Sequence, residues 1–411
     1  MKVVGLITEY NPFTRGHACH LEKSRELADA DYCVAVMSGD YVQRGEPAIF
    51  SKHIRARMAL AAGIDAVFEL PVDTSTGSAE FFAAGAVSLL ESLGCVDTLV
   101  FGSEHGDMEP FLQLAPLLAN ENSHFQESLR LNLKNGLSFP AARAQALTEV
   151  FGETFSDQCR DLLDSPNNIL GLEYCKALYR QNSSIRPLTI KRQGAGYHDI
   201  SLKENHLPSA SALRHLLKPN PENLSKASEV LESFVPDSLY SLYRELLCQG
   251  GPLFPEDFSL LLFTRILEKN EQDLQVIWDL SPELTSRILR LAPGFSGWNS
   301  FISAVKTRDM TQTRVQRALL HLLLDLRSWQ APTYARLLGF RRDSTPLLSE
   351  IKKNSRIPLI SKLANAPEVL SSQALSQLKK NTSASQLYQA VYSQKYHLPF
   401  IHEFQKQVEI L

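Results

Sequence analysis

Short apolar runs alternate with helix-spaced segments through the first part of this 411-residue chain. The apolar runs have the length and composition of buried strands and lie at 3–7, 32–37, 66–71 and 98–102. The segments between them show helical apolar spacing and lie at 17–30, 51–62 and 81–93. This alternation predicts parallel βαβ units, and therefore an α/β fold with a doubly wound, mostly parallel, Rossmann-like sheet. Ligands of such sheets bind at the carboxyl ends of the strands.

The pattern changes after the fourth strand. Residues 109–176 have helical periodicity and predict a helical insertion, and a strand-like run at 188–192 returns the chain to the sheet. Beyond a proline-rich stretch that ends at 221, the pattern is almost entirely helical. We therefore expect an α/β domain over 1–220 and a mainly α-helical domain over 221–411.

Charge is distributed unevenly over these two parts. The chain carries 42 Lys and Arg against 45 Asp and Glu, but residues 301–411 hold 16 basic and 7 acidic side chains. The last quarter is therefore basic, with a net charge of +9, and residues 1–300 carry a net charge of −12. Such asymmetry indicates a polyanionic partner for the basic part. A solvated helical surface that is basic without binding anything is the alternative.

Composition excludes several classes of protein. No window approaches the roughly 18 uninterrupted apolar residues that a membrane span needs, and the first residues lack a signal-peptide pattern. Six cysteines lie far apart without a CxxC pair, which predicts neither a zinc site nor a disulfide framework. We expect a cytoplasmic protein with no bound structural metal.

The strongest chemical motif is Asn11-Pro12-Phe13-Thr14-Arg15-Gly16-His17, a T/HxGH box between the first strand and the first helix. Gly16 lets the backbone approach a phosphate closely, and the free N–H groups of the helix start favour an anion. His17 would donate a ring N–H to a phosphate oxygen, and Thr14 would add a hydroxyl donor. The alternative is a structural histidine in an ordinary helix start.

A second motif, Ser209-Ala210-Ser211-Ala212-Leu213-Arg214, also lies at the start of a predicted helix. Its hydroxyls and helix N–H groups would hold the β- and γ-phosphates of a nucleotide, and the planar Arg214 guanidinium would bind them as a fork. Ser209 as a simple N-cap is the alternative.

These motifs, with several further stretches, resemble the tRNA(Met) cytidine acetate ligase family of the nucleotidyltransferase-like superfamily. The matching stretches are 5–17, 36–48, 68–71, 101–104, 166–171, 191–192, 196–199 and 209–214, with weaker matches at 307–317 and 337–341. The resemblance implies that the chain uses ATP to adenylate acetate and passes the acetyl group to N4 of the wobble cytidine of elongator tRNA(Met). Thr14 departs from many relatives, which carry His there, although both forms of the box occur in the superfamily.

The resemblance also implies the ATP contacts. They are Ile7, Thr8, Glu9, Tyr10, Asn11, Pro12, Phe13, Thr14, Arg15, Gly16, His17, Ala18, Cys19 and His20, then Gly102, Asn167 or Asn168, Arg192, Ser209 and Ser211. Asn167 is favoured over Asn168. Thr14, His17 and Arg214 are the expected catalytic residues.

The reaction that the resemblance implies needs few catalytic groups. Acetate is already an anion, so its attack on the α-phosphorus needs no general base, only alignment and neutralisation of the triphosphate by His17, Arg192, Arg214 and Mg²⁺. Acetyl transfer to the cytosine amine releases a proton, for which Asp40, or alternatively Glu9, is a candidate base. Each carboxylate could equally cap a helix.

Recognition of tRNA is less visible in the sequence. Arg308, Arg314 and Arg317 lie in the basic quarter and could follow a phosphate backbone. Two other functions remain open: an adenylyltransferase acting on a small phosphorylated metabolite, and a non-enzymatic nucleotide-sensing RNA-binding protein. Intact His17 and Arg214 disfavour the second of these, and the basic quarter disfavours the first. The sequence makes no prediction of oligomeric state.

Overall fold

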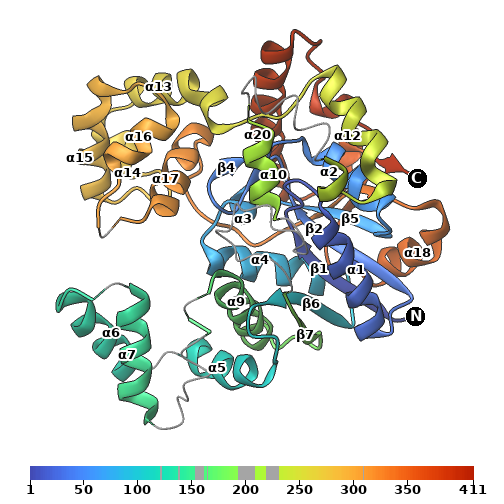
Figure 1. The fold of residues 1–411 in the computed structure, drawn as a ribbon, viewed down its shortest axis with the longest axis horizontal. Helices are drawn as coiled ribbons and strands as arrows, with labels where there is room; N and C mark the ends of the chain where they lie inside the picture. Colours follow the sequence, from blue (N-terminus) through green and yellow to red (C-terminus); the bar gives the residue numbers. More distant parts are fainter. Residues whose placement is uncertain are drawn as a thin grey trace.

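The computed structural model describes residues 1–411 except 121–122, 138, 153–161, 164, 193–208, 219–230 and 309. Its centre is an eight-stranded sheet, and Figure 1 shows helices on both sides of it. The strands of the sheet are β1 (Val3–Thr8), β2 (Tyr32–Ser38), β5 (Ala66–Leu70), β6 (Thr98–Ser103), β7 (Arg186–Lys191), β8 (Ala335–Phe340), β9 (Leu359–Ile360) and β10 (Glu409–Ile410). A separate hairpin consists of β3 (Tyr41–Val42) and β4 (Glu46–Pro47).

The predicted parallel sheet is confirmed. The strand order is β10-β8-β5-β2-β1-β6-β7, and β5, β2, β1, β6 and β7 are parallel neighbours. The reversal of strand order between β2, β1 and β6 places a crevice at the carboxyl end of β1, where a doubly wound sheet binds its ligand.

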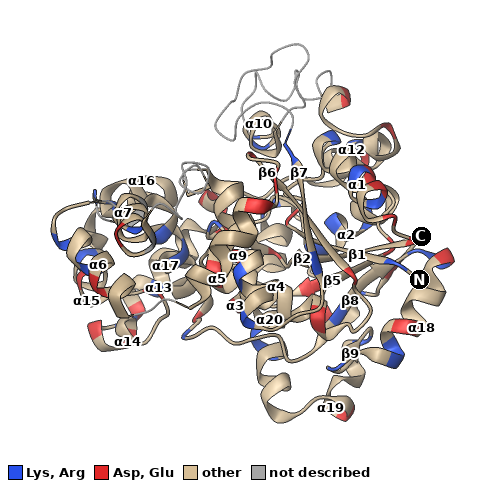
Figure 2. Cartoon of the chain, turned by 90° about the horizontal axis from the view of Figure 1, so that it is seen from below, with Lys and Arg blue, Asp and Glu red and all other residues tan. Residues whose placement is uncertain are grey.

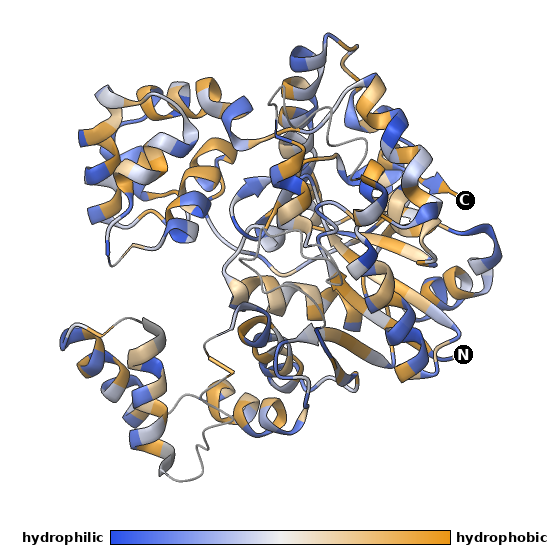
Figure 3. Ribbon diagram, viewed as in Figure 1, coloured by the Kyte–Doolittle hydropathy of each residue, from blue (hydrophilic) through white to orange (hydrophobic). Residues whose placement is uncertain are grey.

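Both faces of the sheet are covered, which the strand sequences require. On β2, Val34 and Val36 belong to the apolar core of one face, and Cys33, Ala35 and Met37 to the core of the other. Side chains alternate between the faces of a strand, so a continuous apolar run can only be satisfied by helices on both sides. Figure 3 shows mainly hydrophobic colouring along the strands of the sheet and a mixture of hydrophobic and hydrophilic residues along the helices around it.

The helices of the N-terminal half connect and cover the parallel strands. They are α1 (Arg15–Ala28), α2 (Lys52–Ala61), α3 (Val72–Ser75), α4 (Ala79–Ser92), α5 (Glu109–Ala119), α6 (Ser123–Lys134), α7 (Phe139–Phe151), α9 (Pro166–Arg180) and α10 (Ala210–Leu216). The helical insertion expected over 109–176 corresponds to α5, α6, α7 and α9. Helices α6 and α7 pair with each other and lie away from the sheet in Figure 1.

The second half contains most of the remaining helices. They are α12 (Asp237–Gln249), α13 (Ser259–Glu268), α14 (Glu271–Gln275), α15 (Pro282–Leu291), α16 (Trp298–Val305), α17 (Gln312–Leu324), α18 (Thr345–Asn354), α19 (Ala366–Val369) and α20 (Ser372–Tyr396). Helices α13 to α17 form the group drawn in yellow and orange at the left of Figure 1, and their apolar core also includes Tyr41, Val72 and, from α20, Tyr388. The mainly helical nature of this half agrees with the sequence prediction.

The C-terminal part differs from the prediction in one respect. Residues 335–411 do not stay in a helical domain, because β8 pairs antiparallel with β5, and β9 and β10 pair with β8. Strand β8 is a six-residue apolar run at 335–340, and periodicity alone cannot distinguish such a run from part of a helix. The predicted boundary at 220 lies outside the described residues.

Two general expectations can be compared with the described structure. None of the described helices is long and apolar enough to cross a membrane. Figure 2 shows basic and acidic residues on α18, which lies in the basic quarter at 301–411, with Lys352 and Lys353 in its last turn.

Candidate active site

The loop between β1 and α1 is held in place by buried aromatic residues. Tyr10 and Phe13 are buried, and their ring centroids lie 4.6 Å apart. The Tyr243 hydroxyl donates to the Phe13 carbonyl oxygen at 2.5 Å, and the Ile49 N–H donates to Asn11 Oδ1 at 2.8 Å. The backbone of the T/HxGH box is therefore fixed by other parts of the protein before any ligand binds.

His17 is held as the tautomer that the proposed chemistry needs. The Thr14 backbone N–H donates to His17 Nδ1 at 3.0 Å, so Nδ1 is an acceptor and the ring proton is on Nε2. Burial, with the nearby charge of Arg192 and the ring of His20, lowers the pKa of His17 from 6.5 to about 3. The imidazole is therefore neutral near pH 7 and can offer its Nε2–H to a phosphate oxygen.

Thr14 lies differently from the sequence prediction. Its side chain is buried, and its hydroxyl oxygen is 3.2 Å from His17 Nδ1. The predicted role as an independent hydroxyl donor to a phosphate does not fit this position, because the oxygen faces the ring and not solvent. Thr14 instead orients the His17 ring through its backbone N–H and side chain.

The second motif, at 209–214, lies against the same loop. Arg214 donates from Nη1 to the Asn11 carbonyl oxygen at 2.6 Å and from Nη2 to Ser211 Oγ at 2.9 Å. Ser209 Oγ accepts from the Ala212 N–H at 3.1 Å, which is the N-cap that the alternative interpretation predicts. The structure thus brings Arg214 to the T/HxGH box and assigns Ser211 to holding the guanidinium.

The loop after β6 supplies a further wall. A Cβ added at Gly102 would lie 3.2 Å from Cγ of Arg192, so the two predicted contacts are neighbours. Asn168 is buried and accepts from the Glu104 and His105 N–H groups at 2.9 and 3.1 Å. Its amide oxygen is therefore used to shape the loop. The match quoted at 196–199 lies outside the described residues.

Asn167 and Glu104 form a pair at this wall. Asn167 Nδ2 donates to Glu104 Oε1 at 2.6 Å, and the Asn168 N–H donates to Glu104 Oε2 at 2.9 Å. Asn167 is only half-buried, so it remains the better candidate of the two for contact with a nucleotide. Sequence reasoning quoted Glu104 only as part of a matching stretch, and no local pattern indicates that both asparagines converge on it.

Arg15 is placed away from the other expected ATP contacts. Its Nη2 lies 2.7 Å from Asp237 Oδ1 and donates to the Glu232 carbonyl oxygen at 2.9 Å. This arrangement directs the side chain to the start of α12. Arg15 therefore ties the box to the second half of the chain, and its predicted contact with ATP is not supported by this geometry.

Asp40 is also placed differently from the sequence prediction. The Lys52 N–H at the start of α2 donates to Asp40 Oδ1 at 2.8 Å, and the side chain is buried. This is the helix-capping alternative. A general base must reach the proton that it removes, so a carboxylate enclosed in this way does not fit the predicted role.

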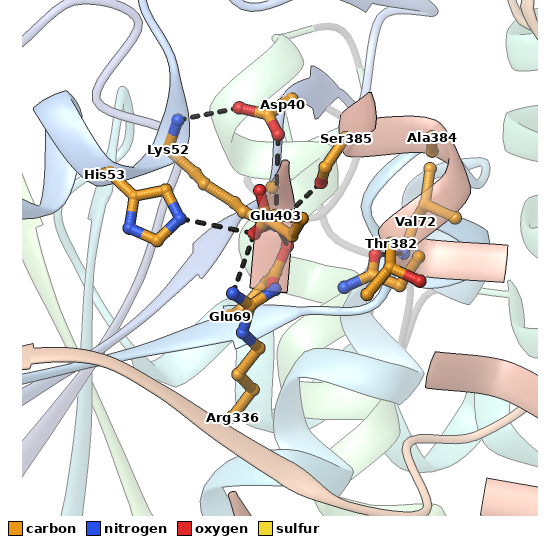
Figure 4. A network of polar contacts seen from close by, with 12 residues as sticks. Asp40, Lys52, His53, Glu69, Val72, Arg336, Thr382, Ala384, Ser385 and Glu403 are labelled. Atoms are coloured by element: carbon orange, nitrogen blue, oxygen red, sulfur yellow. Dashed lines mark hydrogen bonds and ion pairs between the residues drawn. The ribbon is translucent and has the colours of Figure 1, made fainter. Parts of the chain in front are cut away.

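Figure 4 shows the buried ionic cluster to which Asp40 belongs. Lys52 Nζ lies 2.7 Å from Glu69 Oε1 and 2.8 Å from Glu403 Oε1. Arg336 contacts the same two carboxylates at 3.0 and 2.7 Å. Although burial acts to raise it, the charges of Lys52 and Arg336 hold the pKa of Glu403 below its usual value. Sequence reasoning missed this cluster, because its members come from distant segments.

The expected tRNA contacts do not share one environment. Arg308 and Arg314 are exposed. Arg317 has only 14% of its side chain exposed, and its Nε lies 3.5 Å from Asp279 Oδ2. Its place on an open phosphate-binding surface is therefore not supported, because an acidic partner already occupies the guanidinium.

Comparison with known proteins identifies the family of the chain. Residues 1–399 match the model of the HIGH Nucleotidyl Transferase family. The tRNA(Met) cytidine acetate ligase of Acetivibrio thermocellus is 38% identical, and the match covers 100% of both chains. The chain belongs to the tRNA(Met) cytidine acetate ligase family. Another member of this family, from Caldanaerobacter subterraneus, is 40% identical over 89% of each chain.

Solved structures of this ligase family agree with the fold. Thermotoga maritima TmcAL in its apo form superposes with a TM-score of 0.92 and 32% identity over the full length of both chains. The same protein bound with alpha-thio ATP superposes with a TM-score of 0.89 and 31% identity, again over 100% of each chain. The fold predicted from the sequence, and the resemblance on which it partly rested, are both confirmed.

Proposed function

We propose that this protein is an ATP-dependent ligase that activates acetate as acetyl-adenylate and transfers the acetyl group to N4 of the wobble cytidine of elongator tRNA(Met). The observation that carries the proposal is that Arg214 of α10 contacts the Asn11 carbonyl oxygen in the loop that leads into α1, where Thr14 holds the ring of His17 through Nδ1. The related structure bound with alpha-thio ATP supports ATP as the nucleotide. The cytoplasm, where tRNA is available, is the proposed location.

The first half-reaction follows from these two side chains. An acetate oxygen attacks the α-phosphorus, a new P–O bond forms, and the bond to the β-phosphate oxygen breaks to release pyrophosphate. His17 Nε2–H donates to the α-phosphate as negative charge develops there, and the Arg214 guanidinium neutralises the triphosphate. No side chain has to remove a proton, so the missing nucleophile–base pair is no obstacle.

Mg²⁺ is part of the proposal as a companion of ATP. In the described part of the chain, no group of three or more His, Cys, Asp or Glu residues is arranged to hold a metal ion. Mg²⁺ usually keeps several waters and binds through substrate phosphates with one or two carboxylates, so it needs no cluster of three protein ligands. Bound there, Mg²⁺ would stabilise the charge of the leaving pyrophosphate.

The second half-reaction releases a proton from the cytosine amine. The N4 nitrogen attacks the acetyl carbonyl carbon, the C–N bond forms, and AMP leaves with the electrons of the acyl–oxygen bond. Glu9 is the remaining candidate for the proton, since Asp40 is enclosed. Glu9 is half-buried at the end of β1, it accepts from the Gln43 N–H at 2.7 Å, and burial raises its pKa.

Pyrophosphate exchange with a panel of carboxylates tests the proposal. Labelled pyrophosphate should enter ATP in the presence of acetate without tRNA, because His17 and Arg214 lie on α1 and α10 and not on α17. The same enzyme should then acetylate elongator tRNA(Met) but not a transcript whose wobble base is uridine. Exchange that needs no carboxylate would contradict the ligase and favour the adenylyltransferase alternative. Propionate should compete with acetate, since one methylene gives only about 1–3 kcal/mol of discrimination.

A further inference from the structure

The hairpin of β3 and β4, residues 41–47, lies directly beside the loop between β1 and α1, residues 9–14, which we call the ATP loop. The Gln43 N–H donates to Glu9 Oε1 at 2.7 Å, and the Gln43 side chain donates to the Gly77 carbonyl oxygen at 3.3 Å. The Ser75 hydroxyl donates to the Tyr41 carbonyl oxygen at 3.0 Å. Three contacts within the sheet domain therefore fix one side of the hairpin.

The other side of the same hairpin meets helix α17. Gln316 is buried, and its Nε2 donates to Glu46 Oε1 at 2.6 Å. Gly45 has a φ of +79°, and a Cβ at this residue would lie 2.4 Å from the Arg317 backbone nitrogen. Only glycine allows so close an approach between hairpin and helix. The hairpin is thus a spacer between the ATP loop and α17.

Helix α17 presents a different side to solvent. Arg314, one of the two exposed candidates for tRNA contact, lies on this helix two residues before Gln316. Residues two apart on a helix do not share a face, so the side that carries Arg314 is not the side bound to the hairpin. Helix α17 also contacts the sheet part through buried His321, whose Nε2 lies 3.1 Å from the Thr76 carbonyl oxygen. The contact between Gln316 and Glu46 is the side-chain hydrogen bond that joins α17 to the hairpin, and through it any RNA held at Arg314 is connected to the loop between β1 and α1.

We propose that the Glu46–Gln316 pair positions helix α17, and the tRNA bound on it, relative to the acetyl-adenylate. This inference rests on the proposed function. Reacting atoms must approach to about 3–3.5 Å, and a displacement of about 1 Å can lower a rate by about 100-fold. Adenylation involves no residue of α17, whereas acetyl transfer has to bring RNA on α17 to the ATP loop. Gln316 and Glu46 are thus positioning residues for the transfer step alone.

The variant Gln316→Glu tests the pair, because it places two carboxylates opposite each other. Acetate-dependent pyrophosphate exchange should stay within about twofold of wild type, since Gln43 and Tyr41 still anchor the hairpin. The kcat/KM for tRNA acetylation should fall by about tenfold or more, with most of the loss in kcat. Adding Glu46→Gln restores a donor and an acceptor in reversed order and should recover most of the activity.

Gln312→Glu is the matched control. It adds the same charge four residues earlier on α17, where the side chain is exposed, and should change acetyl transfer by less than about threefold. Equal losses in Gln312→Glu and Gln316→Glu, no loss in Gln316→Glu, or no recovery in the double variant would each overturn the inference. A parallel fall in exchange and transfer would show a structural role and overturn it as well. Wild-type enzyme without acetate-dependent exchange would instead contradict the proposed function.

Discussion

Arg214 donates a hydrogen bond from Nη1 to the carbonyl oxygen of Asn11 at 2.6 Å, although 203 residues separate them in the chain. Its second Nη donates to Ser211, so both arms of the planar guanidinium are used for orientation. Lysine has a single point charge and cannot make both contacts while facing a phosphate.

Arg214→Lys should therefore slow adenylation although it keeps the charge. Loss of one charge-assisted hydrogen bond costs about 1.5–3 kcal/mol, or about 10–100-fold in kcat/KM for ATP in the exchange assay. The control is Arg186→Lys, at an exposed residue of β7, and it should leave kcat/KM for ATP unchanged. An Arg214→Lys enzyme as active as wild type would show that the fork geometry is unimportant.

His17→Ala should reduce the rate of pyrophosphate exchange by about 100–1,000-fold and leave the circular dichroism spectrum and melting temperature nearly unchanged. The reason is that Thr14 holds Nδ1, which leaves Nε2–H as the ring donor that the proposed reaction uses. His215→Ala, an exposed histidine near Arg214, is the control. A variant that unfolds, or that keeps full turnover, would identify His17 as a structural residue.

Arg314→Ala and Arg317→Ala should behave differently, although the sequence predicts both residues as tRNA contacts. Arg314 is exposed, so its loss should weaken tRNA binding and flatten the dependence of log K on log salt by about 0.7–0.9. Arg317 is paired with Asp279, so its loss should lower stability by about 1 kcal/mol with an unchanged salt slope. Binding isotherms at several salt concentrations separate the two. Identical salt slopes for both variants would contradict this assignment.

Lys52→Met should destabilise the protein strongly. It leaves Glu69 buried with Arg336 and Glu403 buried with Arg336 and His53, and breaking a buried ion pair in this way costs about 3–5 kcal/mol. Urea denaturation measures the effect, and the exposed Lys352→Met should fall within about 0.5 kcal/mol of wild type. A loss below about 1 kcal/mol for Lys52→Met would mean that the cluster contributes little.

The free energy of unfolding should decrease as pH falls, because of His321. This residue is fully buried, stacks on Trp278 at 4.5 Å, and burial lowers its pKa from 6.5 to about 4. The unfolded chain takes up a proton near pH 6.5 and the folded chain does not, so the free energy of unfolding decreases as pH falls from 6.5 to 4. The contribution is about 1.4 kcal/mol per pH unit.

His321→Gln removes this titration and should therefore have a flatter dependence of unfolding free energy on pH over the same interval. Chemical denaturation at pH 7, 6 and 5 measures the difference between the two slopes. A wild-type slope equal to that of the variant would show that His321 does not titrate as its burial implies.

The sequence by itself determined the parallel part of the sheet and the place of the T/HxGH box, where we propose the nucleotide site. Strands β1, β2, β5 and β6 are continuous apolar runs between helical segments, and a run of that kind is stable only when both faces are covered. The T/HxGH box follows β1 directly, so its place at the carboxyl end of a strand is a matter of local chain order. These features depend on neighbours in the sequence, which is why the sequence suffices for them.

The tertiary structure alone decided which partners the charged side chains have. Asp40 and Glu9 both follow strand ends, but Asp40 is enclosed with Lys52 while Glu9 stays half-buried beside the hairpin. Lys52 is 351 residues before Glu403, and β8 joins β5 from the far end of the chain. Such contacts are set by which distant segment covers a buried charge or an open strand edge, and no local period encodes that choice. The same reason separates exposed Arg314 from Arg317, three residues later.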